Sequence, residues 1–162
     1  MKLKFLSILL LSFTLTACEV PTSDNNSRVV GDGEYQDGFG SEFAGMPESE
    51  LAPGVYDTVY FATDSSVLNS DARVVLSAQA GWLKDNPAIN VVIEGHCDER
   101  ATREYNLALG ERRADAVKRF LISSGVSASR VSTISYGKER PVALGSFAEA
   151  WAQNRRGVTV VR

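Results

Sequence analysis

Residues 93–117 read IEGHCDERATREYNLALGERRADAV, and this stretch decides the fold. A nearly continuous apolar pattern over 89–95 predicts a strand that is covered on both faces, and a polar loop follows it. Thr102 then offers an N-cap for a long helix, which we expect to run to about Ser124 and to end at Gly125. The stretch therefore predicts a strand, a loop and a long helix in immediate succession.

The same alternation of strands and helices continues on both sides of this stretch. Alternating β-branched and aromatic residues predict strands at 57–62, 130–136 and 157–161. Helical spacing of apolar residues predicts a helix between the caps at Asn69 and Asn86, and a short helix over 147–153. We therefore expect a small α/β domain, an α+β sandwich with helices packed on a sheet, rather than a helix bundle or a β-sandwich.

The N-terminus has the pattern of an export signal over residues 1–17. Lys2 and Lys4 precede an apolar run at 5–15, which is too short for the roughly 20 residues of a membrane-spanning helix. The sequence LTAC, ending at Cys18, resembles the lipobox of bacterial lipoproteins, which implies cleavage before Cys18 and its acylation. Two or more acyl chains give stable membrane attachment. The alternative is an ordinary signal with a chance cysteine.

Residues 18–54 differ in composition from the rest of the chain. They hold three prolines, six glycines and eight acidic residues against the single base Arg28, a net charge of -7. Their apolar residues follow no sustained period, so we expect a disordered, flexible tether. The domain at 55–162 has 14 basic and 12 acidic residues, and the acidity of the chain therefore lies in the tether.

Composition excludes several classes of protein. Two cysteines and one histidine cannot build a disulfide framework or a multi-histidine metal cage, and a net charge of -3 argues against nucleic-acid binding. His96, Cys97 and the two acids after them are adjacent in a loop, so they are a poor metal site, and we expect no metal and no cofactor. We expect His96 to be a satisfied polar residue and Cys97 to be a partly buried free thiol rather than a nucleophile.

The long helix carries one charged residue where an apolar one is expected. At 100° per residue, five residues form a stripe that should face the sheet: Tyr105, Leu109, Ala116, Val117 and Phe120. Arg113 projects from the middle of this stripe, and Asn106 lies seven residues earlier, nearly in line with it. A guanidinium among apolar side chains is costly unless it is paired and hydrogen-bonded.

Asp98 is the natural carboxylate to consider beside Arg113. It is the first acid after the 89–95 strand, and it lies near the helix N-terminus, where an anion is favoured. One interpretation is a buried ion pair between Asp98 and Arg113. The other is that the two charges stand apart at a pocket and bind a zwitterion, whose ammonium meets Asp98 and whose carboxylate meets Arg113.

Residues 93–117, with SYGKERP at 135–141 and NRR at 154–156, resemble the OmpA-like peptidoglycan-binding domain. The resemblance covers 55–162 and implies a βαβαβ-type fold on a small mixed sheet. It implies that the stem peptide of peptidoglycan, above all meso-diaminopimelate, is the ligand. Its implied contacts are Asp98, Arg113, Asn106, Leu109 and Arg155. Ala62, Cys97 and Ala101 depart from the family pattern, and Ala101 predicts a loop that avoids the left-handed conformation.

The resemblance further implies a non-catalytic tether. The lipid on Cys18 would hold the chain in the outer membrane, with the domain facing the periplasm and bound to the cell wall. TolB and TolA are implied as protein partners, with a role in envelope integrity and cell division. Two alternatives remain: a generic OmpA-like wall-binding lipoprotein without a Tol role, and an enzyme that modifies the stem peptide.

Overall fold

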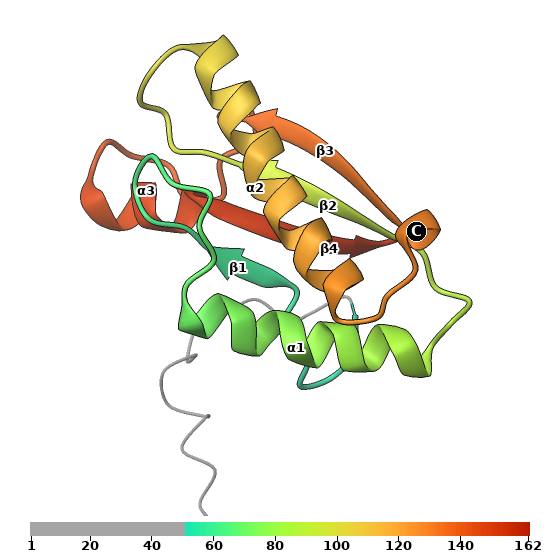
Figure 1. Cartoon of the computed structure of the whole chain (residues 1–162). Helices are drawn as coiled ribbons and strands as arrows, with labels where there is room; N and C mark the ends of the chain where they lie inside the picture. The colour runs from blue at the N-terminus through green and yellow to red at the C-terminus, as the bar shows by residue number, and fades with distance from the viewer. Residues whose placement is uncertain (1–50) are drawn as a thin grey trace, which may run out of the picture. The chain divides into compact units, whose positions relative to one another are not determined.

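The computed structural model describes residues 51–162. The predicted signal at 1–17, Cys18 and the tether lie outside this part of the chain, apart from the last residues of the tether. Within it, the chain forms these elements in order: β1 (Thr58–Tyr60), α1 (Ser70–Asp85), β2 (Val91–His96), α2 (Arg103–Ser123), the 3₁₀ turn η1 (Ala128–Arg130), β3 (Val131–Gly137), α3 (Ala148–Asn154) and β4 (Arg156–Val161) (Figure 1). The predicted α/β class is confirmed.

The strands form one mixed sheet in the order β1-β4-β2-β3. β2 and β3 are parallel, while β4 runs antiparallel to both of its neighbours, β2 and β1. The last strand of the chain therefore lies between the first two, with Gly157 opposite both Val59 and Gly95. This insertion brings the loops after β1 and β2 and the residue before β4 to the same end of the sheet.

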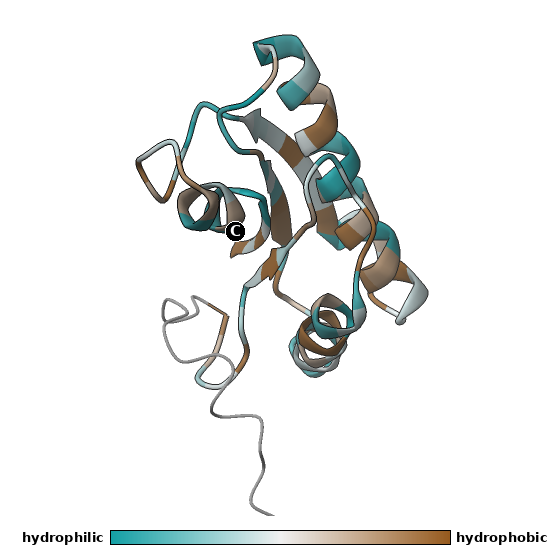
Figure 2. Cartoon of the chain, turned by 90° about the vertical axis from the view of Figure 1, so that its left-hand side faces the viewer, coloured by the Kyte–Doolittle hydropathy of each residue, from teal (hydrophilic) through white to brown (hydrophobic). Residues whose placement is uncertain are grey.

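α1 and α2 pack on the same face of the sheet, whereas α3 lies apart from them (Figures 1 and 2). α1 begins where predicted, because the side chain of Asn69 accepts a hydrogen bond from the Ala72 N–H at 2.8 Å. α2 begins where predicted too, because Thr102 caps it by accepting from the Tyr105 N–H. The chain leaves α2 through Gly125, whose φ of 99° lies in the left-handed region.

α2 crosses β2 at very short range through two glycines. A Cβ at Gly95 would lie 1.9 Å from the carbonyl oxygen of Gly110, so no larger residue fits between strand and helix. The helix therefore faces the sheet with small residues and not only with the large apolar ones. Tyr105, predicted to face the sheet, is instead 42% exposed, which corrects the predicted stripe.

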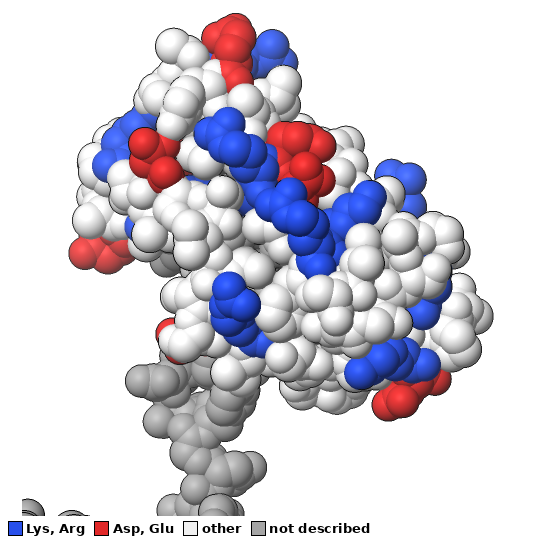
Figure 3. All heavy atoms as spheres, viewed as in Figure 1, with Lys and Arg blue, Asp and Glu red and all other residues white. Residues whose placement is uncertain are grey.

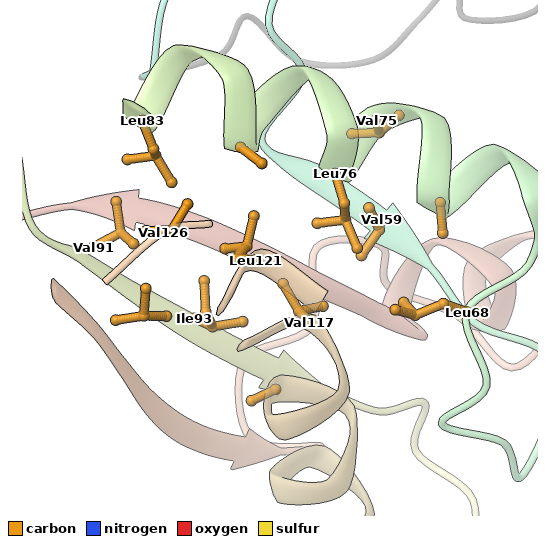
Figure 4. Packing of buried hydrophobic residues seen from close by; sticks show 14 of the residues in the cluster. Val59, Leu68, Val75, Leu76, Leu83, Val91, Ile93, Val117, Leu121 and Val126 are labelled. Carbon is orange, nitrogen blue, oxygen red and sulfur yellow. The ribbon is translucent and has the colours of Figure 1, made fainter. Parts of the chain in front are cut away.

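The core lies between the sheet and the two long helices (Figure 4). Its members come from every layer and include Val59, Leu76, Ile93, Val117 and Leu121, all at most 2% exposed. Burying such side chains stabilises the fold by about 1.5 to 3 kcal/mol each. Leu51 also belongs to this core, although it precedes the expected start of the domain at 55.

Candidate functional site

A cavity of about 300 Å³ opens at the end of the sheet where β1 and β2 finish. Its walls come from the loop after β1, the loop after β2 and the first three turns of α2. The lining residues are Thr63, Asp64, Cys97, Asp98, Arg100, Ala101, Tyr105, Asn106, Leu109 and Arg113. The structure thus brings four residues of the predicted site together: Asp98, Asn106, Leu109 and Arg113.

Arg113 forms the base of this cavity and is completely buried. Its guanidinium donates to three backbone carbonyls, those of Ser65 (2.8 Å), His96 (2.7 Å) and Ala62 (3.1 Å). A fourth N–H points to Cys97 Sγ at 3.4 Å, and the ring of Phe61 lies 5.2 Å from the guanidinium carbon. Because a guanidinium has five N–H groups, one N–H of Nη2 remains for a ligand.

No carboxylate within residues 51–162 forms an ion pair with Arg113. The predicted alternative of a buried Asp98–Arg113 pair is therefore wrong. Burial lowers the pKa of Arg113, which reflects the cost of holding this charge away from water. A buried cation held only by dipoles, at the base of a cavity, favours an anionic ligand.

Asp98 is also buried, at 7% exposure, but its partners are two other arginines. Arg100 reaches it with Nη2 at 2.6 Å and Nε at 3.1 Å, and Arg155 reaches it with Nη1 at 3.5 Å. Burial raises the pKa of Asp98, but the hydrogen bonds from Arg100 and Arg155 outweigh it and leave the pKa lowered. Asp98 is thus a carboxylate under all near-neutral conditions.

Arg155, which follows α3 directly and was predicted as a ligand contact, reaches Asp98 without lining the cavity itself. Its Nε donates to the Phe61 carbonyl at 3.0 Å, which fixes the guanidinium between the loop after β1 and Asp98. Arg155 also lines a neighbouring groove with Ala152 and Gln153. It is therefore a support for Asp98 in this structure.

The backbone around the cavity is strained at two points. Asp64 has a φ of 53° and Ala101 a φ of 66°, and they are the two residues other than glycine with positive φ in the described part of the chain. The prediction that Ala101 avoids the left-handed conformation is wrong. Such conformations cost about 1 kcal/mol or more and persist where surrounding contacts fix them, commonly at functional sites.

Those surrounding contacts hold the loop after β2 from both sides. Lys138 Nζ donates to the carbonyls of Glu99 (3.0 Å) and Ala101 (2.8 Å), and Asn106 Nδ2 donates to the carbonyl of Arg100. Trp151 Nε1 donates to Glu99 Oε1 at 3.1 Å. Asp98 therefore stands on a loop whose position is set by α2, α3 and the end of β3.

Asn106, Leu109 and Cys97 line the inner wall of the cavity. Asn106 is 2% exposed and Leu109 5% exposed, so the wall combines an amide with an apolar surface. Cys97 is a free thiol, as predicted, but at 3% exposure it is buried rather than partly buried, and it donates to the Asn106 carbonyl at 3.3 Å. Burial raises the pKa of Cys97, and the thiol therefore stays protonated near neutral pH.

His96 lies at the end of β2 on the opposite side of the sheet from the core. It is 2% exposed, and neither ring nitrogen has a hydrogen-bond partner within the described residues, so the expectation of a satisfied histidine is wrong. Burial and the charges of Arg156 and Arg140 lower the pKa of His96 to about 3. The ring is neutral near pH 7, and Glu94 Oε2, 3.4 Å from Nε2, does not form an ion pair with it.

Six of the ten residues of the cavity wall were not predicted as ligand contacts: Thr63, Asp64, Cys97, Arg100, Ala101 and Tyr105. Tyr105 was predicted to face the sheet from the helix, whereas its hydroxyl donates to Asp64 across the cavity mouth. Arg100 had a usable signal, because it stands two residues after Asp98 in the same loop, where an arginine can fold back onto the carboxylate.

Among residues 51–162, no helix is long and apolar enough to span a membrane, and no three potential metal ligands are grouped together. The exposed side of α2 carries basic residues, including Arg112 and Arg119, and Lys and Arg side chains gather over this helix in Figure 3. The predicted exposure of Arg112 is confirmed.

The fold and cavity match a known class of domain. The sequence model of the OmpA family matches residues 60–155, which include every strand and helix from β2 to α3 and all ten residues of the cavity wall.

Relatives of similar length narrow the class. The peptidoglycan-associated lipoprotein of Mesorhizobium japonicum is 44% identical over 147 residues, 91% of this chain and 84% of that protein. The protein of the same name from Haemophilus influenzae is 41% identical over 155 residues, 96% of this chain and 97% of its own length. The chain belongs to the OmpA family, in its group of peptidoglycan-associated lipoproteins.

Solved structures agree with this assignment. The crystal structure of the peptidoglycan-associated lipoprotein from Burkholderia pseudomallei superposes with a TM-score of 0.66 at 43% identity, covering 68% of this chain and 94% of that one. The C-terminal domain of Helicobacter pylori MotB shares the fold, with a TM-score of 0.61 at 23% identity, covering 65% of this chain and 84% of that one. The predicted OmpA-like fold is confirmed, and the chain is an envelope-associated lipoprotein by family.

Proposed function

We propose that this chain is a non-catalytic wall anchor whose cavity binds the meso-diaminopimelate residue of the peptidoglycan stem peptide. The observation that carries this proposal is the buried Arg113, which has no carboxylate partner among the described residues while Asp98 stands separately in the same cavity. The names of the relatives, peptidoglycan-associated lipoproteins, support the wall as the ligand.

The cavity offers complementary groups for a zwitterionic amino-acid centre. A ligand carboxylate would meet the remaining N–H of Arg113, and the adjacent ammonium would meet Asp98. Charge-assisted hydrogen bonds of this kind are roughly twice as strong as neutral ones, and removal from water strengthens them further. Asn106 and Leu109 would then contact the neighbouring amide and methylene groups of the ligand. No covalent bond is made or broken in this scheme.

Attachment to the membrane is the other half of the proposed function. Acylated Cys18 would hold the chain in the outer membrane, and residues 18–54 would let the domain reach the wall from the periplasmic side. Many copies on one membrane facing a polymeric wall would convert modest affinity per site into strong attachment. By the same family resemblance, TolB and TolA are the proposed protein partners, in a Tol system that acts in envelope integrity and cell division.

Sedimentation with insoluble peptidoglycan tests the site. We expect Asp98→Asn to reduce the co-sedimenting fraction at least tenfold, because the neutral amide cannot pair with an ammonium. Asp85→Asn is the matched control, since it removes the same charge from an exposed position at the far end of α1 and should leave sedimentation unchanged.

The same sedimentation experiment can be repeated with peptidoglycan of a different stem-peptide composition. Wall that contains lysine in place of diaminopimelate should bind more weakly, because lysine lacks the second carboxylate. Equal sedimentation of Asp98→Asn and the unaltered chain would refute the proposed site. A failed pull-down with TolB would instead favour the alternative, a generic OmpA-like wall-binding lipoprotein without a Tol role.

A further inference from the structure

Asp98 has no free acceptor position in this structure. A carboxylate offers about four lone-pair positions. Oδ1 accepts from the backbone N–H of Arg100 at 3.2 Å and from its Nε at 3.1 Å. Oδ2 accepts from Arg100 Nη2 at 2.6 Å and from Arg155 Nη1 at 3.5 Å. An incoming ammonium group can therefore reach Asp98 only by displacing one of these donors.

The donors differ in how firmly they are held. The side chain of Arg155 is 15% exposed and anchored by its bond to the Phe61 carbonyl, and the backbone N–H of residue 100 belongs to the loop itself. The side chain of Arg100 is 40% exposed, and its one other hydrogen bond within residues 51–162 goes to Thr63 Oγ1 at 3.4 Å. The Arg100 side chain is more exposed than that of Arg155 and is not fixed by a backbone carbonyl, so it is the donor that we expect to leave.

The Arg100 side chain also contacts Trp151 while it is paired with Asp98. The guanidinium carbon of Arg100 lies 4.4 Å from the centre of the Trp151 ring, within the range of a cation–π contact. Trp151 is itself fixed by its bond to Glu99. Displacement of Arg100 from Asp98 would therefore also change the surroundings of the Trp151 ring.

We propose that Arg100 is a specificity-determining residue that occupies the ammonium subsite on Asp98 until a cationic ligand displaces it. This proposal rests on the proposed function and adds that Arg100 competes with the ligand ammonium for Asp98. A ligand whose amine carries a positive charge replaces the salt bridge that it breaks. A ligand with an uncharged or acylated amine cannot replace it, and Arg100 excludes such a ligand from the cavity.

Affinity measurements on the full-length chain in detergent test this competition. The probe is the tripeptide L-alanyl-γ-D-glutamyl-meso-diaminopimelate, titrated by calorimetry. We expect Arg100→Gln to bind it about three to ten times more tightly than the unaltered chain, because the competing ion pair is gone. Arg100→Lys, which can still pair with Asp98, should stay within about twofold of the unaltered chain.

Arg103→Gln is the matched control. It removes the same charge from a side chain that is 69% exposed and pairs with Glu139 rather than with Asp98. Its affinity for the tripeptide should equal that of the unaltered chain. A gain in affinity as large as that of Arg100→Gln would show a general charge effect and would overturn the proposal.

Trp151 provides a readout that a purely structural role of Arg100 would not move. In a Trp82→Phe background, Trp151 is the single tryptophan of the chain. Its emission should change on titration with the tripeptide when Arg100 is present and should stay constant in the Arg100→Gln variant. Emission that responds equally in both variants would overturn the proposal.

Failure of the inference can be told apart from failure of the proposed function. If Asp98→Asn abolishes tripeptide binding but Arg100→Gln binds equally or more weakly, the site stands and the competition is wrong. If the unaltered chain and Arg100→Gln both fail to bind the tripeptide, the proposed function fails and the inference with it. A tripeptide acetylated on the diaminopimelate amine should bind the unaltered chain weakly and Arg100→Gln more tightly, because the side chain that excludes it is gone; equally weak binding to both chains would show that Arg100 does not determine this specificity.

Discussion

At the scale of single residues, Arg113 shows how a buried cation is held without a carboxylate. Its three carbonyl partners come from the loop after β1 and the end of β2, which are distant in sequence. Arg113 therefore joins these two segments beneath the cavity while its charge stays uncompensated. One side chain serves both the stability of the loops and the electrostatics of the site.

Because Arg113 has both roles, its removal should reduce the stability of the domain as well as ligand binding. Arg113→Ala should lower the free energy of unfolding by about 3 kcal/mol or more, because it leaves a cavity and removes the donor from three carbonyls, of which that of His96 is buried. Urea denaturation measures this directly. Arg112→Ala, on the exposed side of the same turn, should change it by less than about 0.5 kcal/mol. A midpoint for Arg113→Ala equal to that of the unaltered chain would contradict this account.

The sequence singled out Arg113 and Asp98 but did not predict how each is satisfied. Periodicity can show that a charged residue stands on an apolar face, because that depends only on position along one helix. The partners of Arg113 are backbone carbonyls, which carry no sequence signal. The pairing of Asp98 with Arg100 depends on the conformation of the loop after β2. In this loop Ala101 has a left-handed backbone, which an alanine at that position argued against.

At the scale of elements, the contact of α2 with β2 sets the position of the whole site. Gly95 and Gly110 let helix and strand approach closely, just beyond the loop that carries Asp98. Asn106 and Arg113 lie on the turns of α2 on either side of Gly110. The separation of strand and helix therefore determines the width of the cavity.

Gly95→Ala should be strongly destabilising. The new methyl group would meet the backbone of Gly110 rather than a flexible side chain, so the helix must move away from the strand. We expect a loss of about 3 kcal/mol in the free energy of unfolding. Gly81→Ala is the matched control, because nothing lies within 4 Å of its Cβ, and it should stabilise α1 by about 0.5 to 1 kcal/mol. Equal melting temperatures for the two variants would contradict this prediction.

Element boundaries followed from local chemistry, whereas packing partners did not. Asn69, Thr102 and Gly125 marked helix ends correctly, because capping depends on neighbours a few residues away. The misassignment of Tyr105 arose because large apolar residues were assumed to face the sheet, while glycine and alanine take that place. The insertion of β4 between β1 and β2 is a long-range pairing that local patterns cannot determine, and only the family resemblance implied a mixed sheet.

At the scale of the whole molecule, the stability of the domain depends on pH through His96. Its pKa is about 3 in the folded chain, against 6.5 as the ordinary value. Well above pH 6.5 the ring is neutral in both folded and unfolded chains and contributes no pH dependence. Below it, the unfolded chain binds a proton that the folded chain does not, so stability falls as pH falls.

We therefore expect the free energy of unfolding to decrease by up to about 1.4 kcal/mol for each pH unit below 6.5. Urea titrations between pH 7 and 5 measure this slope before Asp98 begins to bind protons. His96→Gln should flatten the slope in this window, whatever its effect on stability at pH 7. An unchanged slope in that variant would show that other groups cause the dependence.

The register of β1 against β4 has a mechanical consequence. The chain enters the domain at Leu51, ahead of β1, and β1 leads directly towards the cavity at its other end. Traction between a membrane anchor and a bound wall would pull along this edge strand. Because antiparallel hydrogen bonds lie across the strands, such a force shears the rungs Thr58–Val158, Val59–Gly157 and Tyr60–Arg156 together instead of unzipping them one by one. β1, the first strand after the predicted tether in the sequence, is thus oriented to bear tension.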